Sequence, residues 1–77
     1  MLFLVEYDRK AGQLVSLSPY SCADRHAAQE AHLCLELKLR TDGVEHEVVL
    51  LEAASEGALR KTHRRYFETL EALAEPH

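Results

Sequence analysis

The sequence has few of the residues that mark several protein classes. Its 77 residues include no Trp, two Cys, two Pro and three Gly. Two cysteines are too few for a disulfide scaffold, so we expect a reducing compartment, the cytoplasm. So little Pro and Gly, beside 47% hydrophobic residues, argues against a disordered chain. Neither GxGxxG nor GxxxxGK[ST] occurs, which excludes those two modes of nucleotide binding.

Long hydrophobic runs are also absent. No apolar run approaches the roughly 20 residues that a membrane span requires. The apolar residues 1–5 are followed by four charged residues within 6–10, which argues against a signal peptide as well. A chain of 77 residues is too short for two domains. We therefore predict one domain over residues 1–77, with no membrane association.

The order of apolar patterns predicts two strands, a helix, a third strand and a second helix. Gly12 can take the positive φ of a short hairpin loop between the first two strands, and Pro19 ends the second strand. The central part of the third strand is continuously apolar, which is typical of a strand covered on both faces. The predicted strands cover about residues 2–8, 13–18 and 45–53, and the predicted helices about residues 22–41 and 55–74.

Residues 32–40 carry two conflicting patterns. Leucine alternates with other residues there, which alone indicates a strand. However, residues 23–40 contain no Val, Ile, Thr or aromatic residue and consist mostly of helix formers. Ser21 with Asp24 resembles a helix start, and Gly43 suits a left-handed helix stop. Composition and capping outweigh the alternation, so we predict a helix.

The ββαβα order predicts a small two-layer α+β domain. Its three-stranded sheet, mixed or antiparallel, would pack with the two helices. A right-handed crossover through the first helix delivers the third strand parallel to the second. If the third strand lies beside the first, that pair is antiparallel and the spatial order is 2-1-3, which we favour.

At about 100° per residue, the first helix has one apolar and one polar face. The predicted apolar face holds Ala27, Ala28, Ala31, Cys34, Leu35 and Leu39, and the predicted polar face holds Arg25, Gln29, His32, Glu36 and Arg40. Leu33 and Leu37 fall outside the main apolar face and are neighbours, because they are four residues apart. These two leucines indicate a second apolar surface.

Both sides of the predicted sheet are apolar, which indicates a partner surface. Phe3, Val5 and Tyr7 lie on one side of the first strand. We predict that they join Leu33 and Leu37 in binding a second copy or another protein. A closed dimer through the sheet face or an edge strand would cover them. The alternative is that the helices cover opposite faces of the sheet and a monomer suffices.

The basic cluster near the end of the chain supports a second hypothesis, binding of nucleic acid or another anion. The residues that would make these contacts are Arg60, Lys61, Arg64 and Arg65. A solvated helix face is the competing interpretation, because Glu56 and Glu68 stand four residues from Arg60 and Arg64. The net charge of −4 and the lack of interleaved aromatic residues favour the solvated face.

A small enzyme is the third hypothesis, with Cys22, His63 and Glu6 as its candidate residues. Cys22 and His26 have the spacing of two ligands, but CxxC, HxxxH and HExxH are absent. We therefore predict no metal site and no cofactor. Cys22 and Cys34 would lie about 18 Å apart along a helix, too far to bond within one chain. The leading hypothesis is a small non-catalytic module that self-associates or binds a protein.

Overall fold

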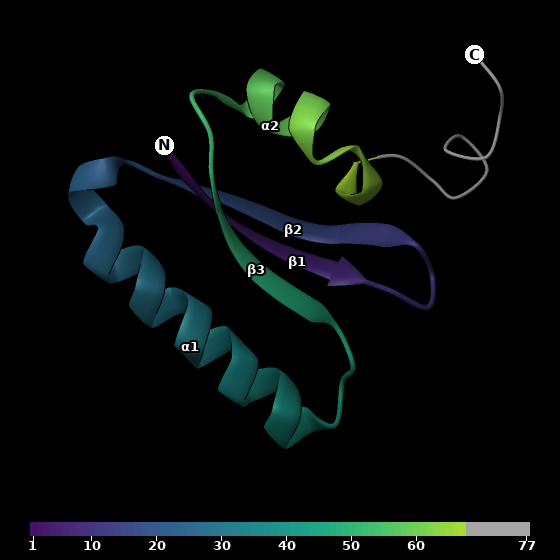
Figure 1. Cartoon of the computed structure of the whole chain (residues 1–77). Coiled ribbons are helices and arrows are strands. Elements are labelled where there is room, and N and C mark those ends of the chain that lie inside the picture. Colours follow the sequence, from purple (N-terminus) through teal and green to yellow (C-terminus); the bar gives the residue numbers. More distant parts are fainter. Residues whose placement is uncertain (68–77) are drawn as a thin grey trace, which may run out of the picture.

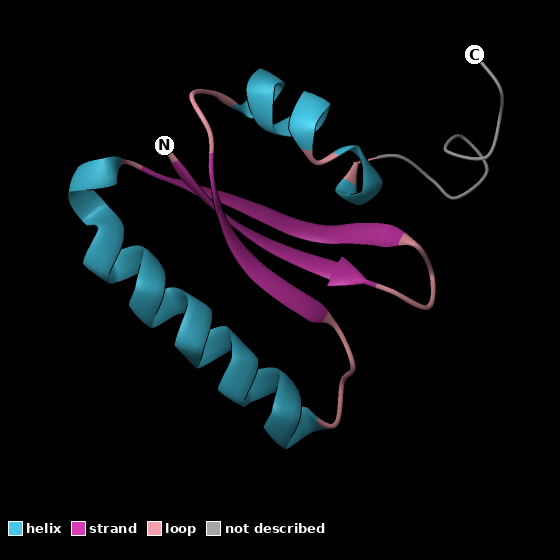
Figure 2. Ribbon diagram, in the orientation of Figure 1, coloured by secondary structure: helices cyan, strands magenta, loops and turns pink. Residues whose placement is uncertain are grey.

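A three-stranded antiparallel sheet lies between two helical segments in the computed structural model, which describes residues 1–67 (Figures 1 and 2). The strand order is β2-β1-β3, and β1 is antiparallel to both neighbours. This confirms the α+β class and the 2-1-3 order, and it selects the antiparallel sheet. The elements are β1 (Leu2–Asp8), β2 (Gln13–Tyr20), the 3-10 helix η1 (Cys22–Asp24), α1 (Arg25–Asp42), β3 (Glu47–Glu52), α2 (Glu56–Thr62) and the 3-10 helix η2 (Arg64–Tyr66).

Local sequence signals set the main turns and caps. Gly12 and Gly43 have φ of 66° and 70°, a region that glycine adopts without a steric penalty. At the end of α1, the amide of Gly43 donates to the carbonyl of Arg40, and the amide of Val44 donates to that of Leu39. The Ser55 hydroxyl accepts from the amide of Ala58 at 3.1 Å and caps α2.

The edge strand β2 differs from the prediction in length and regularity. It continues past Pro19 to Tyr20, because an edge strand has an open side on which proline's missing N–H is tolerated. The register shifts beside Glu6, which pairs with Ser16, whereas the next residue of β1 pairs with Leu14. Val15 is therefore left in a bulge and is 49% exposed.

One face of β1 packs under α2 and η2. Phe3, Val5 and Tyr7 are buried there together with Leu59 and Tyr66. The rings of Tyr7 and Tyr66 meet edge to face, with centroids 5.2 Å apart and planes at 86°. The three β1 side chains are thus core residues, covered by the chain's own helices, and the structure does not expose them as the predicted partner surface.

The other face of β1 packs against α1. Leu2 and Leu4 are buried on this side, and Ala28 of α1 is fully buried. The inward face of α1 centres on Ala28, so it includes the half-buried His32, whose Nε2 lies 3.2 Å from the carbonyl oxygen of Val48. The prediction had placed His32 on the polar face and Cys34 on the apolar face. Cys34 is exposed because it lies too far around the helix from Ala28.

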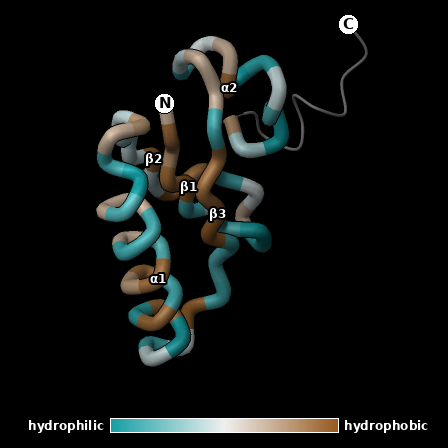
Figure 3. The backbone as a smooth tube through the Cα atoms, turned by 60° about the vertical axis from the view of Figure 1, so that its left-hand side comes forward, coloured by the Kyte–Doolittle hydropathy of each residue, from teal (hydrophilic) through white to brown (hydrophobic). Residues whose placement is uncertain are grey.

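The two helical segments therefore cover opposite faces of the central strand (Figures 1 and 3). This is the arrangement in which one chain covers its own sheet. The apolar strands run between α1 and α2 rather than facing solvent on one side (Figure 3). Any association surface must consequently be sought outside the two faces of β1.

The second helix is shorter than the predicted segment 55–74. It ends at Thr62, and His63 has φ of −124° and ψ of 51°, outside the helical region. The chain then forms η2, which brings Tyr66 into the core. Burial of this ring against Tyr7 favours the turn over a continuous helix. Residues 68–74 of the prediction lie outside the described residues.

Candidate functional site

The outer face of α1 is the principal candidate surface, and we define it by His26, Glu30, Leu33, Leu37 and Arg40. These residues are spaced alternately four and three apart, which keeps them on one side of a helix. Leu37 is about two and a half turns from Ala28, so it lies opposite the residue that touches the sheet. The leucines of this face therefore point away from the rest of the domain, whereas Arg40 also borders a hollow lined by His46 and Val48.

The two leucines of this face are more than half exposed. Leu33 is 57% exposed and Leu37 is 53% exposed. The other large hydrophobic side chains that are exposed within residues 1–67 are Met1, Val15 and Val44, each on a different segment. Leu33 and Leu37 are thus the only such pair, within that range, that occupies neighbouring positions on one helix.

Charged groups flank these leucines at both ends. His26 Nε2 lies 3.1 Å from Glu30 Oε1 on the amino-terminal side, and both side chains are largely exposed. Arg40 follows on the carboxyl-terminal side and is exposed. Its guanidinium forms no ion pair within the part of the chain that the structure describes. The outer face therefore carries opposite charges at its two ends and leucine between them.

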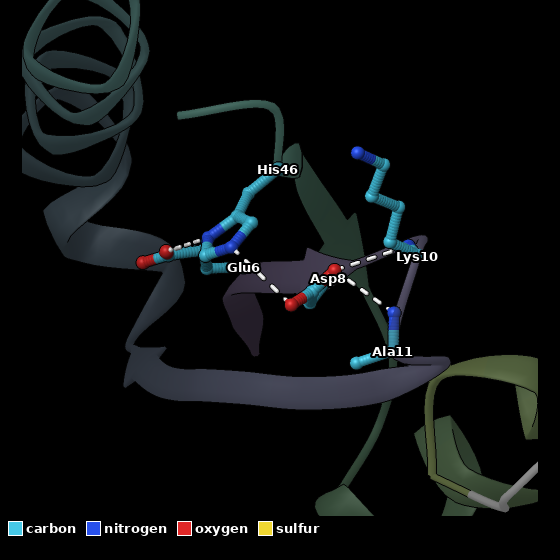
Figure 4. A network of polar contacts seen from close by, with 5 residues as sticks. All are labelled: Glu6, Asp8, Lys10, Ala11 and His46. Carbon is cyan, nitrogen blue, oxygen red and sulfur yellow. Dashed lines mark hydrogen bonds and ion pairs between the residues drawn. The ribbon is translucent and has the colours of Figure 1, made fainter. Parts of the chain in front are cut away.

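A second candidate is the polar cluster of Glu6, Asp8 and His46 (Figure 4). His46 Nδ1 lies 2.6 Å from Glu6 Oε2, and His46 Nε2 lies 3.6 Å from Asp8 Oδ2. Asp8 also accepts hydrogen bonds from the amides of Lys10 and Ala11 at 3.0 and 3.1 Å. The cluster joins the end of β1 to the segment that leads into β3.

The geometry of this cluster indicates a structural clamp. The imidazole bridges two carboxylates, and each of these carboxylates belongs to β1. Both ring nitrogens face carboxylates, which leaves neither open as a base for a substrate. The sequence analysis named Glu6 as a candidate enzyme residue without its partner, because His46 is 40 residues away and their contact depends on the sheet register.

Arg65 is held in a cluster with Glu47 and Tyr66. Its Nη2 donates to both carboxylate oxygens of Glu47, at 2.9 and 3.1 Å. The guanidinium carbon lies 4.3 Å from the centroid of the Tyr66 ring. Desolvation opposes ionisation of Glu47, but hydrogen bonds from Arg65 and Tyr66 outweigh it and lower the pKa of Glu47. Burial and the Glu47 carboxylate together raise the pKa of Tyr66.

The four predicted basic residues do not form one continuous surface. The break at His63 separates Arg60 and Lys61 on α2 from Arg64 and Arg65 on η2. Arg60 pairs with Glu56 at 3.4 Å, as the solvated-face interpretation predicted, and its guanidinium lies over the Phe67 ring. Arg64 is likewise engaged, whereas Lys61 is exposed. Three of these four basic side chains, all but Lys61, thus already interact with other residues of the chain.

The three candidate enzyme residues lie in separate places. Cys22 is exposed in η1, Glu6 lies in the polar cluster on the α1 side of the sheet, and His63 ends α2 on the other side. His63 has its ring centroid 6.4 Å from that of Tyr66. Within residues 1–67, no group of three His, Cys, Asp or Glu side chains is placed to hold a metal ion. None of the helices described there is long and apolar enough to cross a membrane.

Comparisons with known proteins give no similarity from which a function could be transferred. No family model matches the chain, and neither a curated protein nor a solved structure matches it. The functional argument for this chain therefore depends on its own residues and their geometry.

Proposed function

We propose that this chain is a small, non-catalytic protein-interaction module that associates through the outer face of α1. The observation that carries the proposal is the pair Leu33 and Leu37, both more than half exposed and one helical turn apart. Exposed apolar side chains that gather on one face, with charged residues around them, are typical of an interaction site. The charges at His26, Glu30 and Arg40 provide the polar rim.

The fold supports this proposal because it does not need these leucines. α1 covers the sheet with its opposite face, on which Ala28 is fully buried. A polar residue at position 33 or 37 would leave the described core contacts intact and keep the helix amphipathic. Both cysteines are exposed free thiols, which fits a chain that works in the reducing cytoplasm.

Photo-crosslinking in cells tests the proposal directly. A photoreactive amino acid replaces Leu37 in one variant and the exposed Gln13 of β2 in a control variant. We expect protein adducts from position 37 and none above background from position 13. Equal labelling at the two positions, or no adduct at position 37, would overturn the proposal.

A matched pair of substitutions supplies the second measurement. Leu33→Ser combined with a crosslinker at position 37 should reduce the adduct, because it removes half of the apolar surface. Val15→Ser removes an exposed apolar side chain from the β2 bulge and should leave the adduct unchanged. A loss of the same size in both variants would contradict a specific surface on α1.

A further inference from the structure

We infer that the partner of the outer face of α1 is a second copy of this chain, with the two α1 helices antiparallel about a twofold axis. This inference rests on the proposed function and names the partner of that same surface. Its basis is the order of residues along the face. When a second copy of the helix runs in the opposite direction, each charge of one copy faces the opposite charge of the other. The leucines occupy the centre, a carboxylate stands before them and a guanidinium stands after them.

The spacing fixes the register of the pair. An antiparallel arrangement that sets Leu33 against the partner's Leu37 also sets Glu30 against the partner's Arg40. This follows because Glu30 precedes Leu33 by three residues and Arg40 follows Leu37 by three residues. The twofold axis repeats both contacts, so the interface contains four leucines between two pairs of opposite charges.

The charges also exclude the competing orientation. In a parallel pair, Glu30 would face the partner's Glu30 and Arg40 would face the partner's Arg40, and like charges opposite each other are unfavourable. Within one copy, Glu30 and Arg40 are about 15 Å apart along the helix axis and cannot pair. Arg40 has no other ion pair within the described residues 1–67, so its charge is available to a second copy.

The size of the surface predicts a weak, reversible dimer. Four half-exposed leucines and two surface ion pairs offset only part of the cost of association, so we expect a dissociation constant on the order of 0.1 mM. Sedimentation equilibrium over protein concentrations from about 10 µM to about 1 mM covers this range. The association should weaken at high salt, because the charged pairs remain exposed to solvent.

A charge exchange tests the register. Glu30→Arg or Arg40→Glu alone puts like charges together at both ends of the interface, and each should weaken association about tenfold. The double variant Glu30→Arg/Arg40→Glu restores opposite charges across the interface and should return affinity to within about twofold of the natural sequence. Lys38→Glu is the control, because it makes the same charge change as Arg40→Glu but lies on another side of the helix.

Each outcome decides the inference. Rescue by the double variant supports it, provided that circular dichroism shows all four variants folded at low concentration. A natural sequence that stays monomeric at about 1 mM, or a double variant no better than the single ones, would overturn it. An adduct at position 37 with another protein and none between copies overturns this inference alone. No adduct at all overturns the proposed function as well.

Discussion

His46 Nδ1 lies 2.6 Å from Oε2 of Glu6, although 40 residues separate the two in sequence. Their side chains are only 19% and 12% exposed, whereas those of the exposed pair His26 and Glu30 are 86% and 68% exposed. These two histidine–glutamate pairs thus offer a direct comparison of a shielded contact with a solvated one.

His46→Leu should destabilise the fold by about 1–3 kcal/mol, because it leaves the shielded carboxylate of Glu6 without its donor. The matched control is His26→Leu, which breaks a solvated pair and should change the free energy of unfolding by less than about 0.5 kcal/mol. Urea denaturation at neutral pH measures both. Equal effects would show that the Glu6 contact contributes no more than a surface pair.

Leu59→Ala should cost about 2–5 kcal/mol, because Leu59 is fully buried between α2 and the sheet and its truncation leaves a cavity. Leu33→Ala provides the control, because Leu33 lies on the outer face of α1 and alanine is a strong helix former. Its effect on unfolding at low protein concentration should stay within about 0.5 kcal/mol. Similar losses in both variants would contradict the packing of α2 on β1.

Substitution by alanine should change the stability of the fold in opposite directions at two glycines. Gly43→Ala forces a side chain into φ of 70° at the end of α1 and should cost about 1–2 kcal/mol, although no heavy atom lies within 4 Å of the added Cβ. Gly57→Ala falls inside α2 at negative φ and should stabilise by about 0.5–1 kcal/mol. Thermal unfolding measures both effects. A higher Tm for both variants would contradict the left-handed cap at Gly43.

The pair of Glu47 and Arg65 predicts an acid-dependent loss of stability. The folded-state pKa of Glu47 lies below its ordinary value of 4.5, so its stabilisation is present above that value and disappears as the pH falls through the folded-state pKa. Glu47→Gln should therefore be less stable to unfolding than the natural sequence at pH 7, and this difference in stability should shrink below about pH 4.5. Urea midpoints at several pH values measure this.

Glu56→Gln is the control for that series. Glu56 makes a longer, 3.4 Å contact with Arg60, and its side chain is 53% exposed. Its substitution should change stability little at any pH. A Glu47→Gln difference that stays constant between pH 7 and pH 3 would show that ionisation of Glu47 does not stabilise the fold.

Local signals predicted the order of the elements along the chain, and the favoured strand order 2-1-3 is confirmed. Gly12, Gly43 and Ser55 mark turns or caps by backbone chemistry that neighbouring residues alone determine. The placement of His32 on the polar face of the first helix was wrong. Histidine is usually counted as polar, but its ring can lie half buried and donate to a strand carbonyl, as it does here.

Contacts between distant segments account for what the sequence did not reveal. Glu6 meets His46 only because β3 pairs with β1 in one register, and that register depends on the whole sheet. The end of α2 at Thr62 likewise depends on Tyr66 reaching Tyr7. Leu33 and Leu37 were found because their exposure follows from helical spacing alone.

The central place of β1 has a consequence for how the chain acquires its fold during synthesis. Residues 2–8 are synthesised before the other elements of this fold, yet one edge of that strand pairs with residues 47–52 and one of its faces packs against Leu59 and Tyr66. The early β1–β2 hairpin alone is only marginally stable in water. A nascent chain that stops before α2 would thus leave Phe3, Val5 and Tyr7 uncovered on one face of β1. The domain can complete its core only after Tyr66 has left the ribosome.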